Sequence, residues 1–146
     1  MVLGARADPY MAYSFLVELD GLAAAGFSEV TGLGAELEVF DYREGGVNEY
    51  VHRLPGPVRH PGNVALRRGL TADSDLWDWW VETAGGRIRR RNASVLLLAA
   101  DGSIGRRWEL VGAYPVRWSG PDLRAEGAAV AIEALELAHR GIGAPR

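Results

Sequence analysis

Glycine and proline interrupt this chain at short intervals along most of its length. Its 146 residues include 19 glycines and seven prolines, and most segments between them are roughly five to eight residues long, the usual length of a strand. Proline ends or kinks helices and glycine weakens them, so few of these segments have room for a helix. The length suits one domain of ordinary size. The sequence therefore predicts a single, mainly β domain of the α+β class over residues 1–146.

Three turn-forming dipeptides predict β-hairpins. They are Asp20-Gly21, Gly45-Gly46 and Asp101-Gly102. The segments that they join are 13–19 with 26–30, 36–42 with 50–54, and 88–99 with 107–111. Apolar and polar residues alternate in several of these segments, which is typical of strands with one buried face. The second hairpin is expected to be long and to expose its tip.

The remaining segments are less uniform. Residues 64–70 and 114–118 are predicted to form short strands, whereas the prolines within residues 55–62 favour a loop. Residues 128–140 allow two interpretations, because their Ala, Leu and Glu content favours a helix. Their alternation of larger residues with alanine favours a strand.

Residues 74–84 predict the one helix, with Asp73 or Thr71 as the N-cap and Gly85-Gly86 after the end. At 100° per residue, its apolar side chains cover an arc of roughly 200°. The residues assigned to the core from this arc are Leu76, Trp77, Trp80 and Val81. An arc this wide has two explanations. Either two sheets of the same chain sandwich the helix, or part of the Trp-rich surface contacts a neighbouring subunit.

No constellation of residues predicts catalysis. The chain has no cysteine, which excludes disulfides, thiolate nucleophiles and zinc fingers. Its three histidines, His52, His60 and His139, lie in no metal or catalytic motif. We therefore expect neither a catalytic residue nor a bound metal or cofactor. The net charge of −3 argues against a specific nucleic-acid partner. No segment has the length and apolarity of a membrane span, and the first twelve residues lack the apolar run of a signal peptide, which favours synthesis in the cytoplasm.

Charged residues are segregated along the chain. Residues 36–49 carry five acidic side chains against Arg43 alone, and residues 87–91 carry four arginines. Such segregation suits head-to-tail contacts between copies, although it is equally compatible with an ordinary mixed-charge surface. Phosphate binding by the arginines is the weaker interpretation. The candidate interface residues are Glu38, Asp41, Arg43, Glu44, Gly45, Gly46, Glu49, Arg87, Arg89, Arg90 and Arg91.

Several motifs in a fixed order resemble a known family. They are Asp8-Pro9-Tyr10, residues 26–33, Asp41-Tyr42-Arg43-Glu44-Gly45-Gly46 with Leu54-Pro55-Gly56, Leu66-Arg67-Arg68-Gly69-Leu70 with Leu76-Trp77-Asp78-Trp79-Trp80, and residues 130–139. Their order and spacing are similar to those of the tail tube proteins of contractile phage tails and extracellular contractile injection systems. The resemblance covers nearly the whole chain. The proline-rich stretch 57–61 departs from the family pattern.

The resemblance implies two packed antiparallel sheets that form a barrel or sandwich beside one helix, as in the haemolysin-coregulated tube protein of type VI secretion. It implies that residues 130–139 are a strand. It also implies a structural subunit that forms stacked homohexameric rings, with the second hairpin reaching towards an adjacent subunit or ring. The implied partners are further copies of the chain, a sheath protein, spike or baseplate proteins, tube-terminating proteins and a protein cargo in the lumen. The assembled particle would be phage-tail-like and would be released from the cell in some systems.

Two alternatives remain open from the sequence. The form of Asp8-Pro9-Tyr10 is also similar to the paralogue that joins the tube to the spike, so a tube-initiating adapter is the first alternative. The second, more distant alternative is a small ligand-binding β-barrel that is rich in tryptophan.

Overall fold

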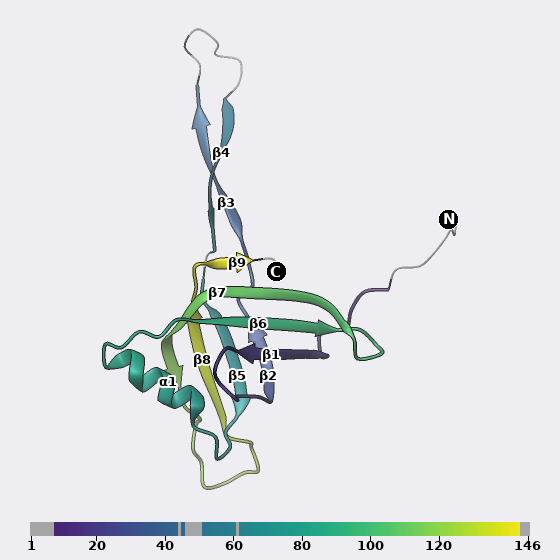
Figure 1. Cartoon of the computed structure of the whole chain (residues 1–146), viewed down its shortest axis with the longest axis vertical. Helices are drawn as coiled ribbons and strands as arrows, with labels where there is room; N and C mark the ends of the chain where they lie inside the picture. Colours follow the sequence, from purple (N-terminus) through teal and green to yellow (C-terminus); the bar gives the residue numbers. More distant parts are fainter. Residues whose placement is uncertain (1–7, 44, 46–50, 61, 144–146) are drawn as a thin grey trace.

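The computed structural model describes residues 8–43, 45, 51–60 and 62–143 (Figure 1). Seven antiparallel strands of the described chain form a sheet in the order β1–β6–β7–β8–β5–β2, with β9 also paired to β7. The strands are β1 (Phe15–Leu19), β2 (Phe27–Thr31), β5 (Val64–Gly69), β6 (Arg91–Leu98), β7 (Ile104–Ser119), β8 (Ile132–Ala138) and β9 (Gly141–Gly143). The end strands β1 and β2 do not pair with each other, so the sheet is not closed into a barrel.

The long strand β7 belongs to two sheets. Residues 104–113 pair with β6, and residues 114–119 pair with β8. The register to β6 shifts between Leu110 and Ala113, near the end of the first part, where Gly112 has a φ of 61° that favours glycine. The bulge bends β7, so that β1, β6, β9 and the first part of β7 form one sheet while β8, β5, β2 and the second part form the other.

The core lies between these two sheets. Alternate side chains of each strand point inwards, as the pleat requires. From one sheet they are Val64, Leu66, Leu135 and Leu137, and from the other Val17, Leu19, Val95 and Leu110. The fold is therefore mainly β with packed antiparallel sheets, as the resemblance implied. Within the described residues, no helix is long and apolar enough to cross a membrane.

The first predicted hairpin is wrong. The chain does reverse after Asp20, but β1 pairs with β6 and β2 pairs with β5, in the other sheet. The second and third hairpins are confirmed, as β3 (Glu36–Tyr42) with β4 (His52–Arg59) and as β6 with β7. Strand β4 includes Pro55 and Pro57, which were expected in a loop. A two-stranded sheet tolerates them because each strand has one unpaired edge.

The segment 128–140 contains a strand, β8, and not a helix. Its residues Glu133, Leu135 and Leu137 are buried, and Ala134, Glu136 and Ala138 face outwards. The pairing of β8 with β5 on one side and β7 on the other outweighs the helical propensity of its alanines and leucines.

Helix α1 (Asp75–Ala84) packs on the molecule through one face only. Leu76 and Trp79 are fully buried, and Trp80 is partly buried against the core. Trp77 and Val81, assigned to the core from the sequence, are instead 43% and 49% exposed. The helix lies beside the second part of β7, and no sheet of the described residues covers its far side (Figure 1). The Trp77 ring contacts Trp118 of β7 edge-on, with 4.7 Å between the ring centroids.

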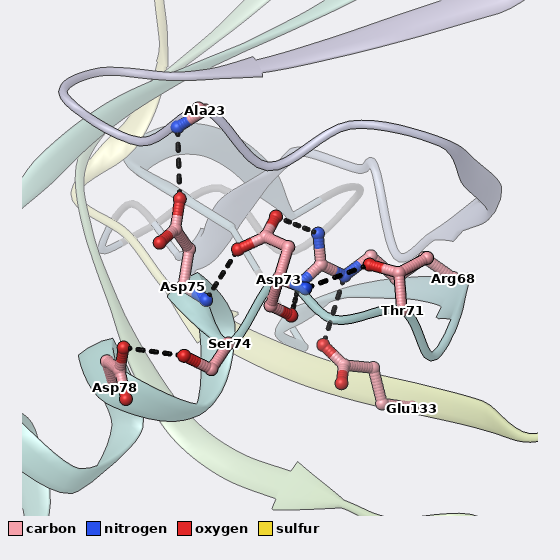
Figure 2. Close-up of polar contacts among 8 residues, drawn as sticks. All are labelled: Ala23, Arg68, Thr71, Asp73, Ser74, Asp75, Asp78 and Glu133. Carbon is pink, nitrogen blue, oxygen red and sulfur yellow. Dashed lines mark hydrogen bonds and ion pairs between the residues drawn. The ribbon is translucent and has the colours of Figure 1, made fainter.

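A buried charge network ties the start of α1 to the sheet (Figure 2). Arg68 of β5 lies opposite Glu133 of β8 in the register, and its Nε donates to a Glu133 carboxylate oxygen at 3.0 Å. Its Nη1 donates to Asp73 at 3.0 Å. Asp73 in turn accepts a hydrogen bond from the backbone N–H of Asp75, and that bond is the main reason why the pKa of Asp73 is lowered. The predicted N-cap, Asp73 or Thr71, is wrong, because Ser74 is the N-cap residue, and Asp73 binds the first helical N–H from one position earlier.

Candidate assembly interface

Strands β3 and β4 form a two-stranded ribbon that projects from the body along the longest axis of the molecule (Figure 1). We call the residues of these two strands, 36–42 and 52–59, the arm. The described arm residues pair with each other and belong to no other sheet. An isolated two-stranded ribbon is marginally stable in water. The arm therefore has the form of a segment that is stabilised by a partner.

Both faces of the arm expose apolar side chains. The register places Leu37 opposite Val58 and Val39 opposite Pro55 on one face. Phe40 lies opposite Leu54 on the other face, where its ring also covers Gly56. The exposed apolar side chains are Leu37, Val39, Phe40, Tyr42, Leu54 and Val58. A contiguous apolar ribbon of this kind marks a site of protein–protein contact.

Arginines of β4 neutralise acidic residues of β3. Arg59 donates to Glu38 at 2.9 Å, and Arg53 lies 3.7 Å from Asp41. The sequence showed an acidic segment opposed only by Arg43, because the arginines of the opposite strand come later in the chain. Arg43 and Gly45 are exposed near the tip. The predicted interface residues Glu44, Gly46 and Glu49 lie outside the described residues.

The basic segment is engaged within the chain. Arg87 and Arg89 lie 3.4 Å and 3.3 Å from the Glu82 carboxylate of α1. Arg90 stacks over Tyr114, and Arg91 donates to the Asp20 carbonyl oxygen at 2.7 Å. The structure thus brings the basic segment to α1 and the body, and not to the acidic residues of the arm. Charge pairing within the chain weakens the case for a purely electrostatic contact between copies.

The seam between the two sheets is a second candidate surface. Strands β1 and β2 flank it, and among the described residues neither has a second strand partner. Between them lies a groove of ≈ 340 Å³ with apolar walls that include Phe15, Val30 and Trp108. Unpaired strand edges are templates for another chain. The seam is therefore suited to lateral contact between copies.

The sheet of β8, β5, β2 and the second part of β7 carries small side chains and paired charges on its outward face. The sequence analysis did not predict this face. Arg67 lies 3.5 Å from Glu29, and Arg117 lies 4.0 Å from Glu136. Alanines and Ser119 line the hollows between these pairs. Small residues do alternate along β5 and β8 in the sequence. Only the structure shows that they share one outward face. Both arginines named on this face thus lie beside a carboxylate.

Two histidines meet where the arm joins the body. The rings of His60, which follows β4, and His139, which follows β8, have centroids 5.4 Å apart. Burial lowers the pKa of His139, and the nearby His60 lowers it further. The Nδ1 atom of His139 is buried without a hydrogen-bond partner among the described residues. The site therefore favours a neutral His139. Within the described residues, no group of three or more metal-ligating side chains occurs.

Lowering the pH from 7 to 5 is expected to reduce stability through His139. The folded chain binds a proton at His139 less readily than the unfolded chain, whose histidine pKa is about 6.5. The contribution of His139 is therefore present above pH 6.5 and is lost as the pH falls towards its lowered folded value. Urea unfolding of His139→Gln should show a weaker dependence of stability on pH between 7 and 5 than the parent chain. Equal slopes for His139→Gln and the parent would contradict this assignment.

The chain has similarities over most of its length to known proteins. A family model described as T4-like virus tail tube protein gp19 matches residues 11–143. A chain in the cryo-EM structure of the anti-feeding prophage baseplate is 29% identical, with a TM-score of 0.81 and coverage of 94% of this chain and 96% of that chain. A chain in the sheath–tube complex of the extracellular contractile injection system PVC is 22% identical, with a TM-score of 0.79 and coverage of 92% and 89%.

A protein with lower sequence identity has a similar fold. Hcp1 from Flavobacterium johnsoniae is 14% identical, with a TM-score of 0.56 and coverage of 90% of this chain and 94% of that chain. No curated protein matches the chain.

Proposed function

The chain belongs to the family of T4-like virus tail tube proteins, and from this we propose that it forms the inner tube of a contractile injection system or phage-tail-like particle. The family is structural, so the chain is a structural component and not an enzyme. The observation that carries the proposal is the family match over residues 11–143.

Copies of the chain form hexameric rings, in this proposal, by pairing the free edges of β1 and β2 with their neighbours. The open seam supports this step, because ring closure would cover the strand edges that the isolated chain leaves exposed. Arg87 and Arg89 keep much of their side chains exposed and contribute to contacts between copies. The assembly is then built from one repeated chain.

The outward face of β8, β5 and β2 lines the lumen. Its small residues and its Arg67–Glu29 and Arg117–Glu136 pairs support this step. A lumen wall must let cargo slide, and paired charges leave no strong net field to hold a cargo of either sign. A protein cargo is the occupant that this wall suits.

The arm contacts the adjacent ring. Replacing Val58, the most exposed aliphatic residue of the arm at 60%, by aspartate is expected to stop stacking and to leave single rings. An aspartate in a desolvated contact would lose its hydration without a partner. Negative-stain electron microscopy and light scattering of the purified chain measure this directly.

The matched control is Ile104→Asp, which places the same charge at an equally exposed position on β7, away from the arm. It should stack like the parent chain. Circular dichroism spectra that match for all three chains would show that the fold is intact. Tubes of normal length from Val58→Asp would refute the role of the arm.

The partners proposed are a sheath protein outside the tube, baseplate or spike proteins at one end and a tube-terminating protein at the other. A second candidate function, the tube-initiating adapter, is favoured by one observation. The baseplate chain is more similar in sequence, at 29% identity, than the chain of the sheath–tube complex, at 22%. Quantitative mass spectrometry of purified particles separates the two functions. An adapter would be present in one ring per particle, and a main tube subunit in many.

A further inference from the structure

Two short connections join the arm to the body, and they lie against each other. Gly32, before the arm, has a φ of 93° and packs on the Asn63 carbonyl oxygen, after the arm, so closely that a Cβ would not fit. Gly62, in the second connection, has a φ of 79°. A few loop residues of this kind form the hinges of proteins. The direction of the arm therefore depends on the contacts that hold these connections in place.

His60, in the second connection, contacts the first connection and the body at once. Its Nδ1 atom lies 3.3 Å from the Gly34 carbonyl oxygen, to which it donates when it carries the proton. Its ring rests on Gly141 of β9, where a Cβ would lie 3.1 Å from Nε2, and β9 lies at the base of the arm (Figure 1). The rings of His60 and His139 have centroids 5.4 Å apart. His60 thus links both connections of the arm to the body.

This arrangement requires that at least one of the two rings is neutral. Two imidazolium rings at such a short separation would repel each other. The Nδ1 atom of His139 is buried and has no hydrogen-bond partner among the described residues, so a proton placed there would find no acceptor. Burial first, and then the nearby His60, lower the pKa of His139. Protonation of both rings is therefore incompatible with the contacts at the base of the arm.

The charged side chains around the two histidines do not offset an added proton. On the elements packed around them, these side chains are Glu36, Glu38 and Arg59 of the arm, Glu136 of β8, Arg140 before β9, Glu109 and Arg117 of β7, and Arg90 beside β7. Glu38 lies 2.9 Å from Arg59, and Glu136 lies 4.0 Å from Arg117. Within the described residues, neither His60 nor His139 forms an ion pair with a carboxylate. Arg140, the residue after His139, adds a further positive charge.

We propose that His60 and His139 form a pH-sensitive latch, which fixes the direction of the arm at neutral pH and releases it in acid. On release, the His60 ring leaves Gly34 and Gly141, and both imidazolium groups become hydrated. The state that binds more protons is favoured as the pH falls, so acid favours the released arm. For each unit by which the pKa of His139 in the latched arm lies below that of a hydrated ring, protonation favours release by a factor of about ten.

The latch would make every contact of the arm pH-dependent. A latched arm is pre-organised, so a partner that binds it loses less free energy in ordering the arm. A released arm must be ordered again before it binds. This consequence for assembly rests on the proposed function, whereas the latch itself does not.

The absence of cysteine allows two spin labels to be placed on the full chain. Tyr42→Cys labels the far end of β3, and Ile104→Cys labels the body. Double electron–electron resonance measures the distance between the labels at pH 7.5 and pH 5, in a solution dilute enough that light scattering shows no stacks. Labelled chain is mixed with excess unlabelled chain, so that only distances within one copy are measured. The distribution should be narrow at pH 7.5 and broad at pH 5.

Two controls separate the latch from general unfolding. Labels at Ile104→Cys and Val116→Cys, both on β7, should keep the same distance at both pH values. His139→Gln and His60→Gln, each combined with the arm labels, should give a narrow distribution at both pH values, because glutamine does not bind a proton. A parent arm with the same distribution at both pH values would overturn the inference. So would a response of His139→Gln equal to that of the parent.

A permanent charge tests the mechanism without a change of pH. His60→Lys should release the arm already at pH 7.5, because it places a fixed cation beside His139. His60→Met is the matched control, since its side chain is similarly long and unbranched but uncharged, and it should keep the arm latched. Release by both variants would overturn the inference, because loss of the imidazole, and not the added charge, would then free the arm. Assembly of the parent into tubes tests the proposed function separately.

Discussion

Replacing Arg68 by methionine is expected to lower the free energy of unfolding by about 3–5 kcal/mol, the usual cost of breaking a buried ion pair. The side chains of Arg68 and Glu133 are 2% and 3% exposed. Removal of the guanidinium would leave the Glu133 carboxylate buried without its cation, and Asp73 would lose the contact that holds it at the start of α1. Urea unfolding followed by tryptophan fluorescence measures the loss.

Two further variants separate the charge from the packing. The double variant Arg68→Met/Glu133→Leu should recover most of the loss, because apolar residues of similar volume replace a buried pair well. Arg67→Met, one position away, removes the exposed pair with Glu29 and should change stability by less than about 1 kcal/mol. A double variant as unstable as the single one would show that hydrogen bonding to Asp73, and not the buried charge, determines the effect.

Trp79→Ala is expected to be equally damaging, at about 3–5 kcal/mol, as for other large residues removed from a core. Trp79 is 1% exposed, and its ring N–H donates to the Arg89 carbonyl oxygen at 3.0 Å. Truncation would leave a cavity between helix and sheet and would free that carbonyl group. Thermal unfolding monitored by circular dichroism measures the change.

The neighbouring tryptophan provides the control. Trp77 is 43% exposed and packs edge-on against Trp118, so Trp77→Ala should cost about 0.5–1.5 kcal/mol in the isolated chain. A loss at Trp77 as large as that at Trp79 would mean that the outer face of α1 is covered. In the assembled tube the same comparison shows whether a neighbouring subunit covers Trp77.

Local patterns in the sequence predicted much of the secondary structure. Gly45-Gly46 and Asp101-Gly102 each lie between strands that do pair, because a short connection leaves the two strands little choice of partner. The arm, which is the main candidate site, was predicted in this way. The alternation in residues 132–138 also indicated a strand, and this pattern outweighed the helical composition once β5 and β7 were present to pair with it.

Turn dipeptides and alternating side chains could not identify which strands pair when the strands are distant in sequence. Asp20-Gly21 has the same turn chemistry as the other dipeptides, yet β1 and β2 pair in different sheets. The helical arc could not show which tryptophan faces the core, because Trp77 and Trp79 are equally apolar. The arginines that neutralise the arm, Arg53 and Arg59, were hidden because only the register of β4 places them opposite acidic residues.

The order of glycines, prolines and alternating side chains determined that this chain is built of short strands, since backbone conformation responds to neighbours within a few residues. Tertiary structure alone decided which edges stay unpaired, which face of α1 is exposed, and that the arm and residues 120–131, which connect β7 to β8, lie at opposite ends. Those features depend on contacts between segments as much as 95 residues apart, as the hydrogen bond from the Tyr10 hydroxyl to the Gly105 carbonyl oxygen illustrates. No local pattern contains that information, because the free energy of such contacts arises only when the whole core is assembled.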